Sequence, residues 1–381
     1  MQPHPLIYLD AAATTPCAAD VATAMHEFST TLFGNPSSTH IMGRLAKNAI
    51  LGSTAQISSM LGCAPNEITF TSGATESNNI VILGANAAKK NIVICPIDHK
   101  SSILAAEELE RKNIEVRRMK IDRCGRIDLE HLSTLVDQNT ALLSLSYVNS
   151  EIGTYQDLSE IRKILNKSSA LFHIDAAQAV GKLPINVKNL GVDCVSISAH
   201  KIQGPKGIGA LYASPSTVSR LRPLTFGGEQ SKLRSGTLPT QLIVGFGIAA
   251  QRINTNSLHA SWKSATQRRI AILETLNSHK ISFQLNSPEK NSIPHILNIS
   301  IPGIGAETII SCLDGVCVSS GSACNSNNLK PSHVITGIGY SPDRANSAIR
   351  LSFTSDMDIN DIKTGVEIFA KTVLKLTTLN Q

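Results

Sequence analysis

The chain has 381 residues, of which 42% are hydrophobic and 17% charged, with no biased tract or heptad run, so a disordered or coiled-coil protein is excluded. Lysine and arginine number 35 against 29 acidic residues, an excess too small and too scattered to indicate a nucleic-acid surface, and direct nucleic-acid binding is not expected. The apolar runs are shorter than the roughly 20 residues that cross a bilayer, and the N-terminus lacks the basic region of a signal peptide. We therefore expect a cytoplasmic protein without membrane contact.

From about residue 67 onward, short β-branched runs alternate with helical patterns. Strands are predicted at 67–71, 91–95, 141–146, 171–174 and 194–198, with a helix over 101–111. This alternation indicates a mostly parallel sheet covered by helices. The run 207–213 follows a short glycine-rich turn, which predicts an antiparallel partner strand.

After Pro239 the pattern changes to a long helical stretch that reaches about His279. Short apolar runs follow at 296–301, 316–319 and 349–353, and the chain ends with an amphipathic helix. A chain of this length normally forms more than one domain, and we place the boundary inside the long helical stretch. The predicted division is a large domain over 14–255 and a small α+β domain formed by 1–13 and 256–381.

The eight cysteines lack the paired close spacing of a zinc site, and the chain is too large to need disulfide bonds. We expect no metal centre. Most of the cysteines should be reduced core residues, and Cys312 and Cys317 in particular lie in apolar surroundings.

An aspartate and a lysine follow two neighbouring predicted strands. Asp175 lies at the carboxyl end of the strand 171–174, where open α/β sheets bind ligands and where a carboxylate can pair with a protonated pyridine nitrogen. Lys201 lies just after the strand 194–198, and a partly desolvated lysine can form a Schiff base with an aldehyde cofactor. Singly, a strand-end aspartate usually caps a helix and a loop lysine is usually solvated. Together, in this order, they indicate a pyridoxal-phosphate site.

A phosphate site should accompany that lysine. The segment 71–78 joins a strand to a helix, so its backbone N–H groups and the Thr75 hydroxyl can hold a phosphate against the positive end of the helix dipole. An ordinary capping box made by Ser72, Thr75 and Glu76 is the alternative. The turn 204–209 is followed by a strand rather than a helix, so neither a P-loop nor a dinucleotide fingerprint fits.

His99 ends the run 92–97 and should face the same edge of the sheet. An imidazole there can stack on a pyridine ring or move protons near neutral pH. A purely structural histidine is the commoner alternative.

Ten motifs follow one another along the chain, at 7–16, 34–38, 70–77, 99–100, 149–153, 175–178, 198–201, 204–207, 234–237 and 319–324. In these residues and in this order they resemble the motifs of the bacterial cysteine desulfurases. The segment 319–324 resembles the subgroup in which the reactive cysteine lies on a long mobile loop. The resemblance implies the pyridoxal-phosphate-dependent, aspartate-aminotransferase-like fold (fold type I) of the class-V aminotransferases.

The resemblance implies a role for each matching residue. Lys201 would carry pyridoxal phosphate as a Schiff base, Asp175 would pair with its pyridine nitrogen, and Gln178 would contact its phenolic oxygen. His99 would stack on the ring, and Arg350 would hold the substrate carboxylate. The other cofactor-binding residues would be Ala74, Thr75, Ser198 and His200 from one subunit, Thr237 from the other, and Asn149, which would also contact the substrate carboxylate. A shared site of this kind implies a homodimer.

The implied reaction converts L-cysteine to L-alanine. Lys201 or His99 would move the α-proton, and the Cys324 thiolate would take the sulfur as a persulfide. A sulfur-acceptor protein would then receive it, in iron-sulfur cluster assembly or in sulfur modification of tRNA or DNA. The chain stops at Gln381, without the longer tail of the iron-sulfur assembly members, so a dedicated acceptor is an open alternative to their scaffold protein.

Two other classes of function stay open at this point. A selenocysteine lyase or an aminotransferase of the same cofactor family would make Cys324 incidental. A non-catalytic interaction subunit would keep the fold but bind no cofactor.

Overall fold

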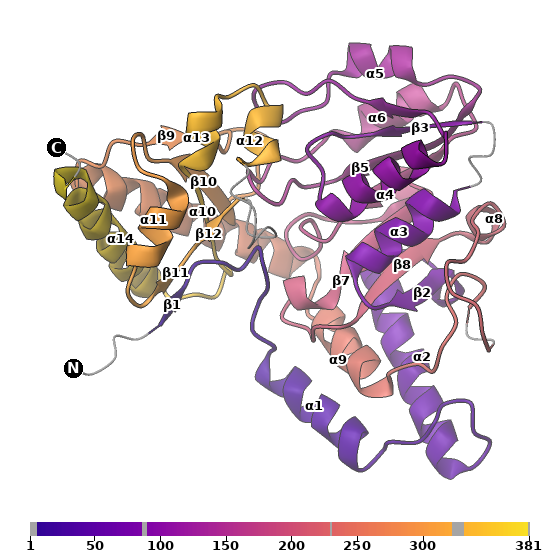
Figure 1. Cartoon of the computed structure of the whole chain (residues 1–381). Helices are drawn as coiled ribbons and strands as arrows, with labels where there is room; N and C mark the ends of the chain where they lie inside the picture. Colours follow the sequence, from indigo (N-terminus) through magenta and orange to yellow (C-terminus); the bar gives the residue numbers. More distant parts are fainter. Residues whose placement is uncertain (1–5, 86–89, 229–230, 322–330, 380–381) are drawn as a thin grey trace.

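The computed structural model describes residues 6–85, 90–228, 231–321 and 331–379. Its largest sheet has seven strands in the order β2-β8-β7-β6-β5-β3-β4 (Figure 1). Strand β8 is antiparallel to both of its neighbours, whereas β7, β6, β5, β3 and β4 are mutually parallel. The predicted α/β fold and the antiparallel strand after the glycine-rich turn are confirmed. The strands are β2 (Ile68–Thr71), β3 (Asn91–Ile94), β4 (Val116–Arg118), β5 (Thr140–Ser146), β6 (Leu171–Asp175), β7 (Cys194–Ser198) and β8 (Gly209–Ala213).

Helices cover both faces of this sheet because alternate strand residues point to opposite sides. Ile92 and Ile94 belong to a core with residues of α3 (Ala74–Gly84) and α4 (Lys100–Arg111). Val93, between them, belongs to the core on the other face. That core includes residues of α2 (Ile41–Leu61), α5 (Leu129–Leu135), α6 (Leu158–Leu165), α7 (Val187–Leu190) and α9 (Thr240–Gln251).

A third core lies on the other side of the molecule, where both ends of the described chain are found (Figure 1). It joins Ile7 and Leu9 near the N-terminus to residues between Ala265 and Val373. Its elements are the parallel pair β1 (Ile7–Tyr8) and β11 (Val316–Cys317), the antiparallel sheet β9 (Gln284–Leu285), β10 (Ile296–Ser300), β12 (Ser319–Ser320) and β13 (Ala348–Ser352), and the helices α10 (Thr255–Ser278), α11 (Ala306–Cys312) and α14 (Ile359–Leu379).

Two predicted elements are divided in the structure. The run 316–319 forms two short strands, β11 and β12, which belong to different sheets. The long stretch after Pro239 forms two helices, α9 and α10, because Asn254 is the N-cap of a new helix. The Asn254 side chain accepts a hydrogen bond from the Ser257 N–H, and the Ser257 hydroxyl accepts one from the Asn254 N–H.

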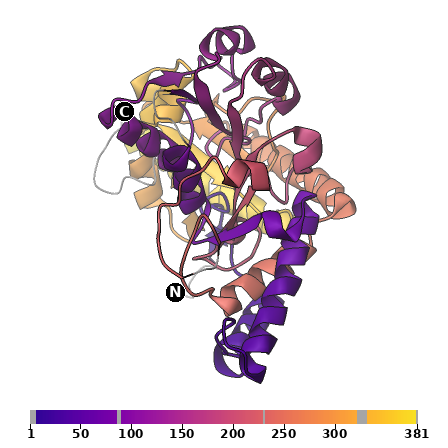
Figure 2. The ribbon, with the colours of Figure 1, turned by 90° about the vertical axis from the view of Figure 1, so that its right-hand side faces the viewer.

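Helices α1 (Ala19–Thr30) and α2 extend below the sheet in Figure 1, and Figure 2 shows the length of α2 from the side. Across the parts of the chain that are described, no helix is both long and apolar enough to cross a membrane. The remaining elements are short: η1 (Pro65–Glu67), η2 (Ala199–Lys201), α8 (Pro215–Val218), α12 (His333–Gly337) and α13 (Pro342–Asn346).

The expectation that most cysteines are core residues is wrong for the described ones. Cys95 and Cys194 are buried, Cys63 and Cys317 are half-buried, and three are exposed, namely Cys17, Cys124 and Cys312. Cys312 is the last residue of α11, whose buried face is formed by Ala306 and Ile309, so its apolar sequence neighbours do not enclose it.

Candidate active site

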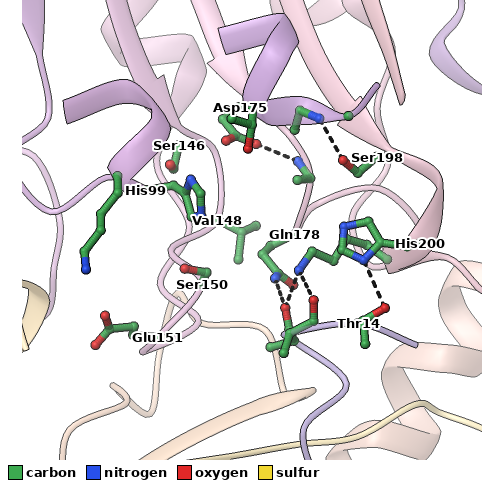
Figure 3. A pocket seen from close by; sticks show the side chains of 18 of the residues that line it. Thr14, His99, Ser146, Val148, Ser150, Glu151, Asp175, Gln178, Ser198 and His200 are labelled. Carbon is green, nitrogen blue, oxygen red and sulfur yellow. Dashed lines mark hydrogen bonds between the residues drawn. The ribbon is translucent and has the colours of Figure 1, made fainter. Parts of the chain in front are cut away.

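A cavity of about 580 Å³ opens at the carboxyl ends of the central parallel strands. Ser146, Asp175 and Ser198, the last residues of β5, β6 and β7, all line it. In Figure 3, Ser198 and His200 lie on one side of this cavity and His99 on the other, with Asp175 at its upper end. Nine of the residues predicted from the sequence line the cavity: Ala74, Thr75, His99, Asp175, Gln178, Ser198, His200, Lys201 and Arg350.

Asp175 is held from two sides. Its Oδ1 accepts a hydrogen bond from the Ala177 N–H at 2.9 Å, and its Oδ2 accepts one from the Asn78 amide at 2.7 Å. The same Asn78 nitrogen is 2.9 Å from the Ser101 hydroxyl, which in turn lies 2.8 Å from Nδ1 of His99. Asn78 and Ser101 therefore join the predicted carboxylate to the predicted imidazole, and the sequence analysis assigned neither of them a role.

Lys201 lies in η2, directly after β7, and points back to the N-terminal segment. Its ammonium donates to the carbonyl oxygens of Ala12 at 2.6 Å and Ala13 at 2.7 Å. The Gln178 amide donates to the Ala12 carbonyl as well, at 2.7 Å. Lys201 and Gln178 are therefore positioned by one shared acceptor, and Lys201 can release it when its amine reacts.

The N-terminus of α3 lines the cavity, and so do Lys206 and His200. Gly209 allows β8 to approach this helix end closely, because a Cβ there would lie 2.6 Å from the Gly73 Cα and 2.5 Å from the Ile197 carbonyl oxygen. The Ser198 hydroxyl accepts a hydrogen bond from the Ala74 N–H at 2.8 Å. A helix N-terminus with hydroxyl groups and a lysine suits an anionic group such as a phosphate.

The capping interpretation of this segment is partly correct. The Glu76 carboxylate accepts a hydrogen bond from the Ser72 N–H and pairs with Arg234. Burial raises the pKa of Glu76, but the hydrogen bond from Ser72 and the charge and hydrogen bond of Arg234 together hold it below its usual value. Thr75 is exposed, and the hydrogen bonds that cap the helix leave its hydroxyl out.

His200 is partly buried beside the two lysines of the site. Burial, followed by the charges of Lys201 and Lys206, lowers the pKa of His200 to about 4. Its Nδ1 lies 3.0 Å from the Thr14 hydroxyl (Figure 3). The ring is therefore neutral at pH 7 and can act as a hydrogen-bond donor or acceptor.

Arg350 brings a buried guanidinium to the lining of the cavity. It donates to Asp10 Oδ1 at 2.8 Å and to the Ser150 carbonyl at 3.0 Å. Among the described residues, its Nε and the shielded ammonium of Lys100 have no hydrogen-bond partner. A buried donor without a partner is unfavourable, so these two groups suit an anionic ligand.

Asn149 lies within the wall of the cavity rather than on its lining. Its amide nitrogen donates to the Ile97 carbonyl at 2.9 Å, and its oxygen accepts from the N–H groups of Glu151 and Ile152. These contacts fix the turn that carries Ser150 and Glu151. Direct contact of Asn149 with a substrate stays a prediction.

Two buried carboxyl groups of the cavity were not singled out from the sequence. Burial raises the pKa of Asp98 to about 7, and one of its oxygens accepts from the Ser146 N–H at 2.9 Å. Burial also raises the pKa of Glu151 to about 7, although a hydrogen bond from Ser332 and the charges of Arg350 and Lys100 lower it. Both groups can therefore exchange a proton near neutral pH.

Besides Asn149, two predicted site residues do not line this cavity as described. Thr237 is exposed and follows Gly236, whose φ is +121°. Cys324 lies outside the described residues. Gly321, three positions before it in the sequence, lines the cavity, and a Cβ at Gly321 would lie 2.1 Å from Oε2 of Glu151.

Comparison with protein families identifies residues 7–364 as an aminotransferase class-V sequence. Cysteine desulfurase IscS of Rickettsia typhi (strain ATCC VR-144 / Wilmington) is 42% identical over 363 residues, which are 93% of this chain and 88% of that relative.

Solved structures agree with this. A NifS-like protein superposes with a TM-score of 0.88 at 31% identity, covering 98% of this chain and 100% of that one. SspA in complex with cysteine superposes with a TM-score of 0.81 at 36% identity, covering 91% of this chain and 98% of that one. The chain belongs to the class-V aminotransferase family and, within it, to the cysteine desulfurases that its motifs resemble.

Proposed function

We propose that the chain is a pyridoxal-phosphate-dependent cysteine desulfurase that transfers the sulfur of L-cysteine to its own Cys324. The net reaction converts L-cysteine and the Cys324 thiol to L-alanine and a Cys324 persulfide. One sulfur atom passes from the substrate to Cys324, and every other atom of L-cysteine is found in L-alanine. The observation that carries the proposal is that Lys201, Asp175 and the N-terminus of α3 line one cavity.

The residues present fit pyridoxal phosphate. The phosphate would lie at the N-terminus of α3, near Ser198, His200 and Lys206. The Asp175 carboxylate, fixed by Asn78 and Ala177, would accept a hydrogen bond from the pyridine nitrogen and keep it protonated. When bound, the cofactor supplies an electron sink for the bond-breaking steps at the substrate α-carbon. The other contributions to the reaction come from the chain itself.

The residues around Lys201 would bind and orient the substrate. The guanidinium of Arg350 and the ammonium of Lys100 would hold the carboxylate of L-cysteine, since both have buried donors that lack a partner among the described residues. The Lys201 Nζ, as an amine, would take the α-proton and return a proton to carbon. His99, tied to Ser101, is a second group that can carry a proton on its imidazole.

Sulfur transfer requires a second nucleophile besides Lys201. The Cys324 thiolate would attack the substrate sulfur, so that a sulfur–sulfur bond forms and the carbon–sulfur bond breaks. The electron pair of the broken bond passes to carbon, which gains a proton and becomes the methyl group of alanine. The persulfide would then pass to an acceptor protein.

The nucleophile is tested by replacing Cys324 with alanine and measuring alanine release and protein-bound persulfide. We expect normal cofactor colour but no persulfide and at least a hundredfold slower alanine formation, because removal of a nucleophile abolishes its step. The matched control is Cys312→Ala, since Cys312 is an exposed cysteine on α11. Full-rate alanine formation in Cys324→Ala would show that the nucleophile is misassigned.

Cofactor attachment is tested by the visible absorption of the purified chain with added pyridoxal phosphate. We expect Lys201→Ala to lose the band of the bound Schiff base, while Lys188→Ala, a change at an exposed lysine of α7, keeps it. A wild-type chain that stays colourless would favour the non-catalytic interaction subunit. That alternative, an aminotransferase and a selenocysteine lyase are not favoured by the relatives described above.

A homodimer with a shared site, in a cytoplasmic setting, completes the proposal. Large apolar side chains on α2 and in the segment before it are exposed, among them Phe33, with an exposed fraction of 69%, and Ile41, with 59%. Phe226, eleven residues before Thr237 in the sequence, has an exposed fraction of 84%. Such side chains suit a subunit interface, from which Thr237 would reach the partner's phosphate. The two sides of the molecule would act as domains, 14–255 against 1–13 with 256–381.

The sulfur acceptor is proposed to be a protein. Transfer of label from sulfur-labelled cysteine in a complete cell extract, followed by a pull-down, would identify it. Labelling of small thiols alone would count against a protein acceptor.

A further inference from the structure

Lys182 lies behind the candidate active site and has no role in the reaction described above. It follows Gly181, whose φ of +76° reverses the chain so that the lysine folds back on the turn after β6. Its ammonium lies 3.2 Å from the carbonyl oxygen of Gln178 and 3.2 Å from the side-chain oxygen of the same residue. The partly buried Lys182 thus donates two hydrogen bonds to Gln178, a residue that is predicted to contact the cofactor.

Gln178 is held in one orientation by groups on its two sides. A side-chain amide can turn over, exchanging its oxygen and its nitrogen. Here the oxygen faces the Lys182 ammonium, while the nitrogen donates to the Ala12 carbonyl. Turning the amide over would bring an N–H group against an ammonium and an oxygen against a carbonyl. Lys182 and Ala12 therefore both select the orientation in which nitrogen is on the Ala12 side.

The selected orientation matters because Gln178 lines the cavity. Its amide nitrogen carries two N–H groups, and the Ala12 carbonyl accepts one of them. The other is then available for an oxygen atom of a ligand in the cavity. The Ala12 carbonyl also accepts from Lys201, so the contacts run continuously from Lys182 through Gln178 and Ala12 to the reactive amine.

Lys182 borders a second cavity, of about 210 Å³, which also touches Gln178 and Lys201. The charged and titratable groups around this cavity are Lys182, Lys201, Arg252, His295 and Asp356. Burial and repulsion by Lys201 lower the pKa of Lys182 to about 7, and burial followed by the charge of Lys182 lowers the pKa of His295 to about 3.

We propose that Lys182 is a positioning residue, which holds the Gln178 amide so that its free N–H faces the oxygen of the cofactor ring. The inference rests on the proposed function, because Gln178 acts there on pyridoxal phosphate. It assigns Lys182 no contact with the substrate.

The test is a double-mutant cycle in the full chain with Lys182→Met, Gln178→Ala and the double variant. Each single change is expected to lower kcat about tenfold, with KM for cysteine changed less than about twofold. The double variant should be no slower than Gln178→Ala alone, because Lys182 acts through Gln178. Lys182→Arg, which keeps a charged donor, should recover most of the loss, and Lys188→Met is the control at an exposed lysine.

Cofactor binding gives a readout that does not depend on turnover. The dissociation constant of pyridoxal phosphate from the cofactor-free chain should rise about three- to tenfold in Lys182→Met and by the same factor in Gln178→Ala, without a further rise in the double variant. Should Lys182→Met fail to fold, Lys182→Leu, which also lacks a donor, replaces it in the cycle with the same expectation.

The outcomes separate the two proposals. The role of Lys182 is overturned if the losses of the two single variants multiply in the double variant, or if Lys182→Met behaves like the wild type. The proposed function still stands in that case, provided that the wild type binds pyridoxal phosphate and forms alanine. A wild-type chain that binds no pyridoxal phosphate would overturn the proposed function and the role of Lys182 with it.

Discussion

Asn78 and Asp175 are joined by a hydrogen bond of 2.7 Å between residues 97 positions apart in the sequence. Asn78 lies on α3, whose N-terminus faces the cavity, and Asp175 is the last residue of β6. The same amide continues to Ser101 at the start of α4. One side chain thus links α3, β6 and the start of α4, where the predicted residues Ala74, Asp175 and His99 line the cavity. Any change in how α3 packs on the sheet therefore also moves the carboxylate.

Replacing Asn78 with alanine should loosen Asp175 without removing it. We expect a loss of about 1–2 kcal/mol in the free energy of unfolding, since a buried carboxylate oxygen loses a donor. The dissociation constant of pyridoxal phosphate should rise about tenfold. Urea unfolding and cofactor titration measure the two effects. Ser101→Ala, which removes the hydroxyl contacts with Asn78 and His99 but keeps the hydrogen bond between Asn78 and Asp175, should leave cofactor affinity within about twofold. An equal loss in both variants would contradict the assignment.

His173 predicts a dependence of stability on pH. It is fully buried between the hydroxyls of Ser144 and Ser196, and burial lowers the pKa of His173 to about 4, against 6.5 for an exposed ring. Below pH 6.5 the unfolded chain therefore binds a proton that the folded chain does not. The stabilising contribution is complete above pH 6.5 and is lost as the pH falls towards 4.

The measurement is urea unfolding of the wild type and of His173→Gln between pH 4 and pH 7.5. We expect the wild type to lose on the order of 2–3 kcal/mol more than the variant over this range. Control measurements on His131→Gln, a variant at a partly exposed histidine of α5, should follow the wild type. Parallel pH profiles for wild type and His173→Gln would show that the buried ring is not neutral.

The predicted strands of the large sheet are short apolar runs that are mostly buried, whereas the edge strand β4 (Val116–Arg118), none of whose residues is buried, was not predicted. Thr140–Ser146 and Cys194–Ser198 have the β-branched and apolar residues that a parallel sheet requires. The break between α9 and α10 was missed because periodicity alone does not detect it. Its signal is local, since Asn254 and Ser257 cap each other's N–H groups at the start of α10.

Without the family resemblance, the candidate site is predictable only where it coincides with strand ends. Ser198 and Arg350 are expected only from the resemblance. Asp175, His99 and Lys201 follow from the rule that open sheets bind ligands at the carboxyl ends of their strands. Asn78 and Lys182 do not, because their roles come from contacts that depend on packing and chain reversal. The burial of Glu151 was missed for a different reason. Acidic residues are normally exposed, and a loop sequence contains no pattern that predicts a buried one.

Gly209 predicts a steric requirement at the phosphate end of the cavity. In Gly209→Ala the new Cβ would collide with backbone atoms of Gly73 and Ile197, which cannot move as a flexible side chain would. We expect a loss of about 2 kcal/mol or more in stability and weaker binding of pyridoxal phosphate, since the N-terminus of α3 must shift. The matched change is Gly52→Ala in α2, where a Cβ meets nothing within 4 Å. This substitution should stabilise the protein by about 0.5–1 kcal/mol, because alanine has a higher helix propensity than glycine. Equal stabilities for the two variants would refute the clash.

Glu151 predicts a pH dependence of the opposite sign to that of His173. Burial raises the pKa of Glu151 to about 7 from the usual 4.5, so the folded chain holds a proton that the unfolded chain releases. The contribution to stability is complete below pH 4.5 and is lost as the pH rises through 7. Gln at this position keeps the shape and can still pair with the Ser332 hydroxyl, which lies 2.5 Å from the carboxyl oxygen.

Glu151→Gln should therefore gain stability over the wild type as the pH rises from 5 to 8, by on the order of 2 kcal/mol in urea unfolding. Arg350 and Lys100 act against this trend, because their charges favour the carboxylate. If those charges dominate, the variant will instead become less stable than the wild type at pH 8, and Glu151 is a buried counter-ion rather than a retained acid. The sign of the difference at pH 8 thus decides whether the substrate carboxylate meets a neutral or an anionic neighbour beside Arg350.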